Sequence, residues 1–182
     1  MLENAFLHQS EIQQKLYTTW YDDRYKYFNN GAYHCGFSFG EADGDWNSAS
    51  LASVNSNGEV IGLITYGIRR LDQRVENMGI LSFESKASKE FVMDVITAID
   101  DIFLKYNFRK LEWTCITDNP AYTAEYKFVE NAGGRQVCVF RNHTRLDDNK
   151  YHHSAIFEIT RKEWKKVGHI RYKKLITDWK AL

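Results

Sequence analysis

Two stretches of the sequence combine residue types that could bind charged groups. Residues 85–89, Ser-Lys-Ala-Ser-Lys, place two lysines and two hydroxyls directly before a predicted helix. A helix start favours anions, so this stretch could hold a phosphate, with an ordinary capped helix start as the alternative. Residues 20–28 are rich in aromatic rings and contain Asp22 and Asp23. These types suit a cationic amine, although a helix core with a solvated acidic edge is the favoured alternative.

The histidines and cysteines do not indicate a metal site. His152 and His153 are adjacent in a predicted strand, where neighbouring side chains face opposite ways, so they cannot share one ion. We expect no metal, and one histidine that is buried and hydrogen-bonded. Cys35, Cys115 and Cys138 are odd in number and form no CxxC pair, which predicts reduced thiols rather than disulfides or zinc.

The elements that position these residues follow from periodicity and turn signals. Asn57-Gly58 between two apolar runs predicts a hairpin, because both residues tolerate positive φ. Apolar residues at helical spacing between 91 and 106, preceded by Ser88 as a cap, predict a long helix. The remaining pattern predicts a helical segment over 1–46, strands at 49–54, 60–68, 75–83, 110–116, 135–141 and 151–159, a helix from Pro120 to about 131, and a helix beginning at Thr160.

The overall composition fits one ordered domain. The chain has 182 residues, of which 5 are Trp, 11 Tyr and 11 Phe, so it is far from a disordered composition. It carries 24 basic and 24 acidic residues. This balance disfavours a protein that coats nucleic acid. The sequence shows neither a signal peptide nor an apolar run of membrane-spanning length, and we expect a cytoplasmic protein with no membrane partner.

Five short phrases, in this order, give the chain a resemblance to the GNAT acetyltransferase superfamily. They lie at residues 58–64, 77–81, 107–113, 118–121 and 151–164. The resemblance covers about residues 47–165 and is strongest to the branch related to ribosomal-protein N-terminal acetyltransferases. It implies a mixed α+β or α/β fold with about seven mostly antiparallel strands flanked by helices. Around this core we expect an acceptor-side segment at 1–46 and a basic tail at 166–182.

The resemblance implies direct transfer of an acetyl group from acetyl-CoA to a primary amine. It places a bulged, splayed strand end at residues 81–84 and the pyrophosphate at the start of the following helix. The implied cofactor-binding residues are Leu81, Phe83, Ser85, Lys86, Ser88, Lys89 and Asn119. Tyr126, seven residues after Asn119, is the implied general acid, with Tyr122 competing for that role. Glu84 is the first candidate base and Glu76 a second one.

The chain departs from the family at the phosphate loop. Residues 84–89 stand in place of the family's glycine-rich loop. They contain no glycine, and this loop is several residues shorter than the family's. The alternative to an enzyme is therefore a degenerate GNAT-fold binding or assembly module. The acceptor remains open among small amines and peptide termini, and a homodimer is open as well.

Charge is unevenly distributed along the chain. Residues 1–45 hold three basic and seven acidic residues, whereas residues 159–182 hold eight basic and two acidic ones. The acidic end fits a cationic amine acceptor. The basic end could contact anions or form a solvated helix.

Overall fold

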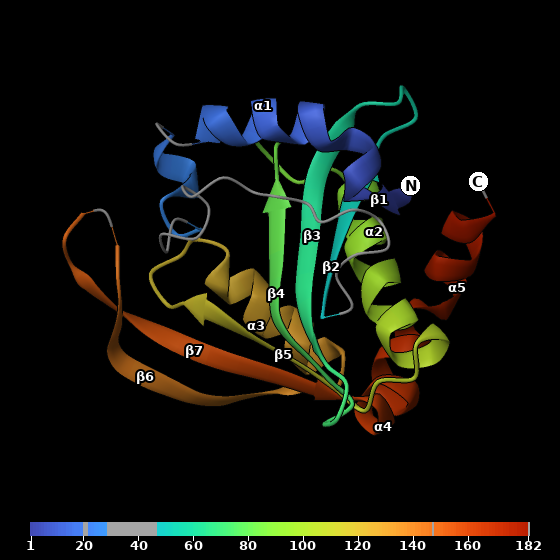
Figure 1. The fold of residues 1–182 in the computed structure, drawn as a ribbon. Helices are drawn as coiled ribbons and strands as arrows, with labels where there is room; N and C mark the ends of the chain where they lie inside the picture. The colour runs from blue at the N-terminus through green and yellow to red at the C-terminus, as the bar shows by residue number, and fades with distance from the viewer. Residues whose placement is uncertain (20–21, 29–46, 147, 182) are drawn as a thin grey trace.

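The computed structural model describes residues 1–19, 22–28, 47–146 and 148–181, which form one seven-stranded sheet flanked by helices (Figure 1). The strand order is β1-β2-β3-β4-β5-β7-β6, with β4 and β5 parallel and the other neighbours antiparallel. The strands are β1 (Leu2–Asn4), β2 (Ser48–Val54), β3 (Val60–Arg69), β4 (Arg74–Ser82), β5 (Lys110–Ile116), β6 (Arg135–Arg145) and β7 (Tyr151–Thr160). The predicted fold class is confirmed.

The helices are α1 (Gln9–Thr19), α2 (Lys89–Asp100), α3 (Tyr122–Asn131), α4 (Arg161–Glu163) and α5 (His169–Lys180). Short 3-10 helices cover Ala5–His8 and Asp23–Tyr25, and π-helical turns at Asp101–Lys105 and Trp164–Gly168 extend α2 and join α4 to α5. Among the described residues, no helix is long and apolar enough to cross a membrane.

The local signals that predicted these elements are present in the structure. Gly58 has φ +82°, and the Asn55 side chain accepts hydrogen bonds from the Asn57 and Glu59 backbone N–H groups. Ser88 caps α2 by accepting from the Phe91 N–H at 3.2 Å. These turns and caps satisfy backbone groups that the ladders and helices leave free.

Two apolar clusters lie on opposite faces of the sheet. The first joins α2, α3 and α5 to the sheet and includes the fully buried Ile102, Phe103 and Trp164. The second lies between α1 and strands β2 to β4 and includes Ile12 and Leu81. Each fully buried side chain of this size contributes about 1.5–3 kcal/mol relative to exposure.

The C-terminal residues, which include the predicted basic tail at 166–182, pack along α2. Trp164 donates its indole N–H to Asp100 Oδ1 at 3.0 Å, and Trp179 donates to Asp94 Oδ1 at 2.8 Å. Both aspartates are buried, so each indole supplies a partner to a carboxylate that would be costly to leave alone.

The parallel pair β4–β5 separates after a very short contact. Only Arg74↔Lys110 and Val75↔Leu111 are paired between these strands. A bulge in β4 follows: its register against β3 passes from Gly67↔Glu76 to Thr65↔Gly79, and Asn77 has φ +53°. The bulge expected at 81–84 therefore lies at 77–78 instead, where an Asn tolerates the left-handed backbone.

Candidate active site

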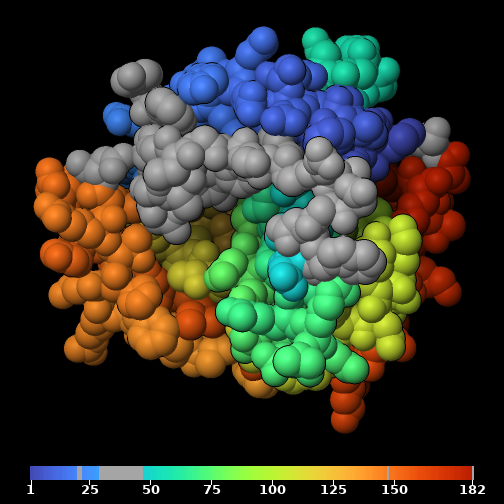
Figure 2. All heavy atoms as spheres, in the orientation of Figure 1, coloured from blue at the N-terminus to red at the C-terminus, as the bar shows by residue number. Residues whose placement is uncertain are grey.

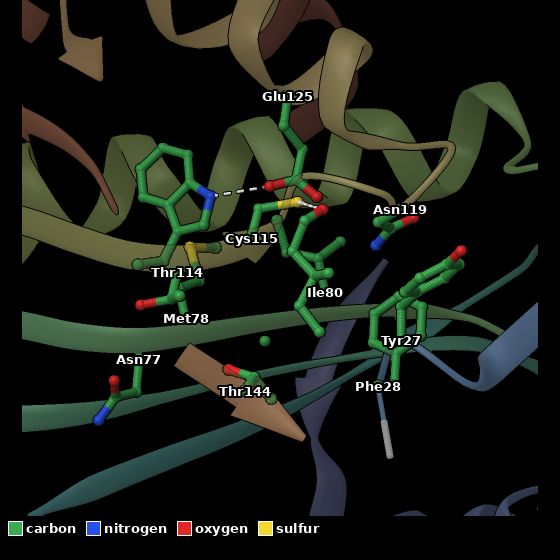
Figure 3. A pocket seen from close by; sticks show the side chains of 13 residues that line it. Tyr27, Phe28, Asn77, Met78, Ile80, Thr114, Cys115, Asn119, Glu125 and Thr144 are labelled. Atoms are coloured by element: carbon green, nitrogen blue, oxygen red, sulfur yellow. Dashed lines mark hydrogen bonds between the residues drawn. The ribbon is translucent and has the colours of Figure 1, made fainter. Parts of the chain in front are cut away.

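Two cavities border the gap between β4 and β5. The strand-side cavity, about 210 Å³, is lined by residues 77–80 of β4 and 113–116 of β5, together with Tyr27 and Thr144 (Figure 3). The helix-side cavity, about 470 Å³, lies between α2 and α3. Five residues line both: Phe28, Met78, Ile80, Trp113 and Glu125. The two cavities therefore share a wall made of these five side chains. In Figure 2, yellow atoms of the β5–α3 region are visible between the green β4 region and the orange β6–β7 region.

Glu125 of α3 is the carboxylate in this shared wall. Trp113 Nε1 donates to Glu125 Oε2 at 3.0 Å, and the Cys115 thiol is within hydrogen-bond reach of both Glu125 and the Ile116 carbonyl (Figure 3). Residues 113 and 115 lie on the helix-facing side of β5, because side chains alternate along a strand.

Burial raises the pKa of Glu125, and its bonds to Trp113 and Cys115 offset only part of this effect. Burial also raises the pKa of the Cys115 thiol, and the neighbouring carboxylate adds to the shift. Cys115 is therefore a neutral thiol rather than a nucleophile. A carboxylate with a raised pKa in a cleft is suited to accept and return a proton.

The sequence interpretation missed Glu125, although a signal was present. Glu125 follows Tyr122 by three residues and precedes Val129 by four, so it lies on the apolar stripe of α3. A lone carboxylate on an apolar helix face needs a partner in the fold. That partner is Trp113, which is distant in sequence and adjacent only in the folded structure.

Tyr126, the predicted general acid, packs against two other aromatic rings. Its ring contacts those of Tyr122 and Phe157, its hydroxyl bonds to Glu130, and 37% of its surface is exposed. It lines neither cavity. Successive helix residues differ by about 100° in direction, so a helix that turns Glu125 into the gap turns Tyr126 away from it. Tyr122, its competitor, bonds through its hydroxyl to Gln136 at 2.6 Å.

The two candidate bases also lie away from the strand-side cavity. Glu84 lines the helix-side cavity near the start of α2, and its Oε2 accepts from the Ser88 N–H at 3.2 Å. Glu76 pairs with Arg69 at 2.7 Å and with Arg74 at 2.9 Å, beside a separate surface pocket.

The predicted cofactor residues are divided between several places. Leu81 is buried under α1, and Phe83 packs against the same cluster, because the bulge turns Met78, Ile80 and Ser82 toward the helix-side cavity instead. Asn119 lines the strand-side cavity, with its Oδ1 accepting from the Ala121 N–H at 2.9 Å.

The predicted phosphate loop is partly occupied by its own hydrogen bonds. Ser85 lines the helix-side cavity, whereas the Ser88 hydroxyl is used as the helix cap. Lys86 and Lys89 are exposed.

Residues of the aromatic run line the strand-side cavity, whereas Asp22 forms an ion pair with a neighbouring arginine. Tyr27 and Phe28 line the strand-side cavity. Asp22 pairs with Arg24 at 2.5 Å, so its charge is already matched within the same turn. Residues 20–21 of this run, like Cys35, lie outside the described residues.

His152 is buried and hydrogen-bonded, as predicted for one member of the histidine pair. Its Nδ1 lies 2.8 Å from Asp118 Oδ2, and its Nε2 lies 3.1 Å from Asp148 Oδ2. The neighbouring His153 is exposed and accepts from the Asn142 N–H. Asp118 and Asp148 raise the pKa of His152 against a smaller effect of burial, Asp118 being the largest cause.

The seven-stranded mixed sheet of this chain resembles the fold of solved N-acetyltransferase structures. The comparison with solved structures agrees: the chain is similar to spermidine N-acetyltransferase SpeG from Vibrio cholerae in complex with manganese ions, at a TM-score of 0.58 and 18% identity, over 67% of this chain and 70% of that one. For a chimera of Vibrio cholerae SpeG and hSSAT, the TM-score is 0.58 and the identity 18%, over 67% of this chain and 74% of that one. For a point mutant of SpeG from Vibrio cholerae, the TM-score is 0.57 and the identity 18%, over 66% of this chain and 69% of that one.

These likenesses establish the fold. No protein-family model matches the sequence, and no curated protein matches it in sequence. The resemblance to the ribosomal-protein branch stays a prediction.

Proposed function

We propose that this chain is an N-acetyltransferase that moves an acetyl group from acetyl-CoA directly to a primary amine in the gap between β4 and β5. The observation that carries this proposal is the Glu125 carboxylate in the wall shared by the two cavities. A thioester approaching from one side and an amine from the other would meet beside it.

The acyl-pantetheine half of the donor fits the helix-side cavity. Its walls are largely apolar, with Phe91, Val95 and Ile99 from α2 and Phe128 from α3. Beyond Val75 no ladder pair joins β4 to β5 in the described chain, so the facing backbone edge of β4 is available to the pantetheine amides. Bound there, the donor supplies an activated acetyl group.

Glu125 would move the proton that the transfer requires. An amine arrives as an ammonium and must lose a proton before its nitrogen can attack the thioester carbon. The ammonium releases one proton to solvent, and Glu125 accepts a second proton from the attacking nitrogen as the C–N bond forms and the C–S bond breaks. The protonated Glu125 then returns the proton to the departing thiolate, which restores the carboxylate. The raised pKa of Glu125 suits both halves of this exchange.

The strand-side cavity would receive the amine. Tyr27 and Phe28 present aromatic rings, and Asn119 and Thr144 add polar groups. An aromatic and carboxylate-lined cavity favours a cationic ligand. SpeG is named for spermidine, so a polyamine is the first acceptor to test, followed by a peptide with a free N-terminus.

The alternative is a GNAT-fold binding module without activity. Two observations favour it: Tyr126 lies outside both cavities, and Glu84 lies at the helix start expected to bind pyrophosphate.

The deciding experiment incubates the chain with acetyl-CoA and a panel of amines, and follows both thiol release and acetylated product by mass spectrometry. For the most active acceptor, we expect Glu125→Gln to lower kcat by about 100-fold or more, since a general base contributes about 10²–10⁴-fold. Binding of acetyl-CoA should be nearly unchanged.

Glu130→Gln is the matched control, because Glu130 is an exposed carboxylate on the same helix that lines neither cavity. It should retain full activity. Binding of acetyl-CoA without transfer to any amine would favour the binding module, and equal loss in both variants would reject Glu125 as the base.

A further inference from the structure

The start of α2 carries a carboxylate close to where the donor's pyrophosphate would lie. Glu84 Oε2 accepts from the Ser88 N–H, and the Ser88 hydroxyl accepts from the Phe91 N–H, both at 3.2 Å. Two N–H groups at this helix start are thus satisfied from within the chain. Residues 84–89 contain no glycine, so the backbone has less freedom to wrap closely around a phosphate.

The charge of Glu84 opposes a second negative group. Glu84 is half-buried, and together with Ser85 and Ala87 it lines the α2 end of the helix-side cavity. Lys86 and Lys89 are exposed to solvent, which screens their attraction for an anion. The nucleotide half of the donor therefore meets a fixed negative charge, whereas its acyl-pantetheine half meets an apolar cavity.

We propose that this chain recognises its donor through the acyl-pantetheine half and that Glu84 penalises the nucleotide half. The donor class is then a pantetheine thioester, with or without the nucleotide. This inference rests on the proposed function, because it concerns the donor side of the same opening.

Calorimetry on the full chain, with acetyl-pantetheine and acetyl-CoA as the two probes, tests the proposal. The two dissociation constants should agree within about threefold, a difference of less than about 1 kcal/mol. Acetyl-CoA binding more than about tenfold tighter than acetyl-pantetheine would overturn the inference and leave the proposed function standing. If neither thioester binds, the proposed function fails and the inference fails with it.

The Glu84→Gln variant isolates the charge. Gln keeps an oxygen that can accept from the Ser88 N–H, so the helix start is preserved. Two like charges near a protein surface repel, so removing the charge of Glu84 should tighten acetyl-CoA binding about tenfold. Binding of acetyl-pantetheine should change by less than about twofold, because it carries no phosphate.

Glu90→Gln is the matched control. Glu90 lies in the first turn of α2 but lines a different cavity, beside Asp94 and Trp179. It should leave both dissociation constants within about twofold of the original values. If Glu84→Gln does not tighten acetyl-CoA, or if Glu90→Gln tightens it equally, the specific role of Glu84 is rejected.

Discussion

At the scale of single residues, three carboxylates of the described chain each accept a hydrogen bond from an indole N–H. Asp94 is paired with Trp179, Asp100 with Trp164, and Glu125 with Trp113. The first two pairs attach the C-terminal region to α2, in the body of the protein. The third lies in the gap between β4 and β5, where the same bond would tune a reacting group instead of fastening a helix.

Trp113→Phe should move the pH dependence of acetyl transfer. The indole N–H favours the charged form of Glu125, so its loss raises the pKa of that carboxyl further. The acidic limb of the kcat/KM profile should therefore shift to higher pH, as measured by initial rates from pH 5 to 9.

The control is Trp164→Phe, which breaks the corresponding pair with Asp100 outside both cavities. Asp100 keeps His169 as a partner at 2.8 Å, so the variant should lower stability by about 1.5–3 kcal/mol for one lost hydrogen bond to a charged group, without moving the profile. Identical profiles for the original chain and Trp113→Phe would contradict a role of the indole in tuning Glu125.

At the scale of elements, His152 ties two loops to the start of β7. Asp118 lies between β5 and α3, and Asp148 lies in the turn between β6 and β7. The Tyr27 ring also contacts His152 edge-on, with centroids 6.2 Å apart. Tyr27 lines the strand-side cavity, so this clamp supports one of its walls.

The clamp should make stability depend on pH. The two aspartates raise the pKa of His152 in the folded state, whereas a histidine in the unfolded chain has a pKa of about 6.5. The contribution of His152 is therefore fully present below about pH 6.5 and is lost as pH rises through the higher folded pKa. Urea unfolding of the original chain and His152→Gln between pH 5.5 and 8.5 should show a difference that shrinks with rising pH.

His153→Gln is the matched control, because His153 is the exposed neighbour without these carboxylates. Its stability difference from the original chain should not shrink across the same range. A constant difference for His152→Gln would show that the histidine contributes packing alone.

At the scale of the whole molecule, the sheet consists of two parts that meet at one short seam. Beside the two β4–β5 pairs, Arg74 pairs with Glu112 at 3.2 Å, and the Arg109 N–H donates to the Gln73 carbonyl at 2.8 Å. The proposed donor site lies above this seam, so a bound thioester would contact both parts.

Donor binding should accordingly stabilise both sides of the gap. At a concentration of about 100 times Kd, acetyl-CoA should add about 2.7 kcal/mol to the free energy of unfolding. For a chain of this length that corresponds to a rise in Tm of about 5–10 °C. Hydrogen exchange should slow in β4 and β5 together. Protection confined to α2 would contradict binding within the gap.

The sequence predicted those parts of the fold that depend on neighbouring residues. The Asn57-Gly58 turn, the Ser88 cap and the apolar stripe of α2 are local signals, and all three are found in the structure. The bulge at Asn77 displaced the expected cofactor positions, because one extra residue reverses which side chains face the cavity. Glu125 was missed because its hydrogen bond with Trp113 joins α3 to β5, two elements that only the folded structure brings together.

The seam also bears on how the chain acquires its structure. β2, β3 and β4 follow one another through short turns, as do β6 and β7, whereas β4 and β5 are separated by the whole of α2. Contacts between distant segments cost more loop entropy and form later than hairpins. We therefore expect the two parts to fold as separate nuclei, with the β4–β5 seam closing last. The gap between β4 and β5, where the proposed reaction takes place, would then be the last part of the molecule to form during folding. It would also be the first part to open when the molecule unfolds.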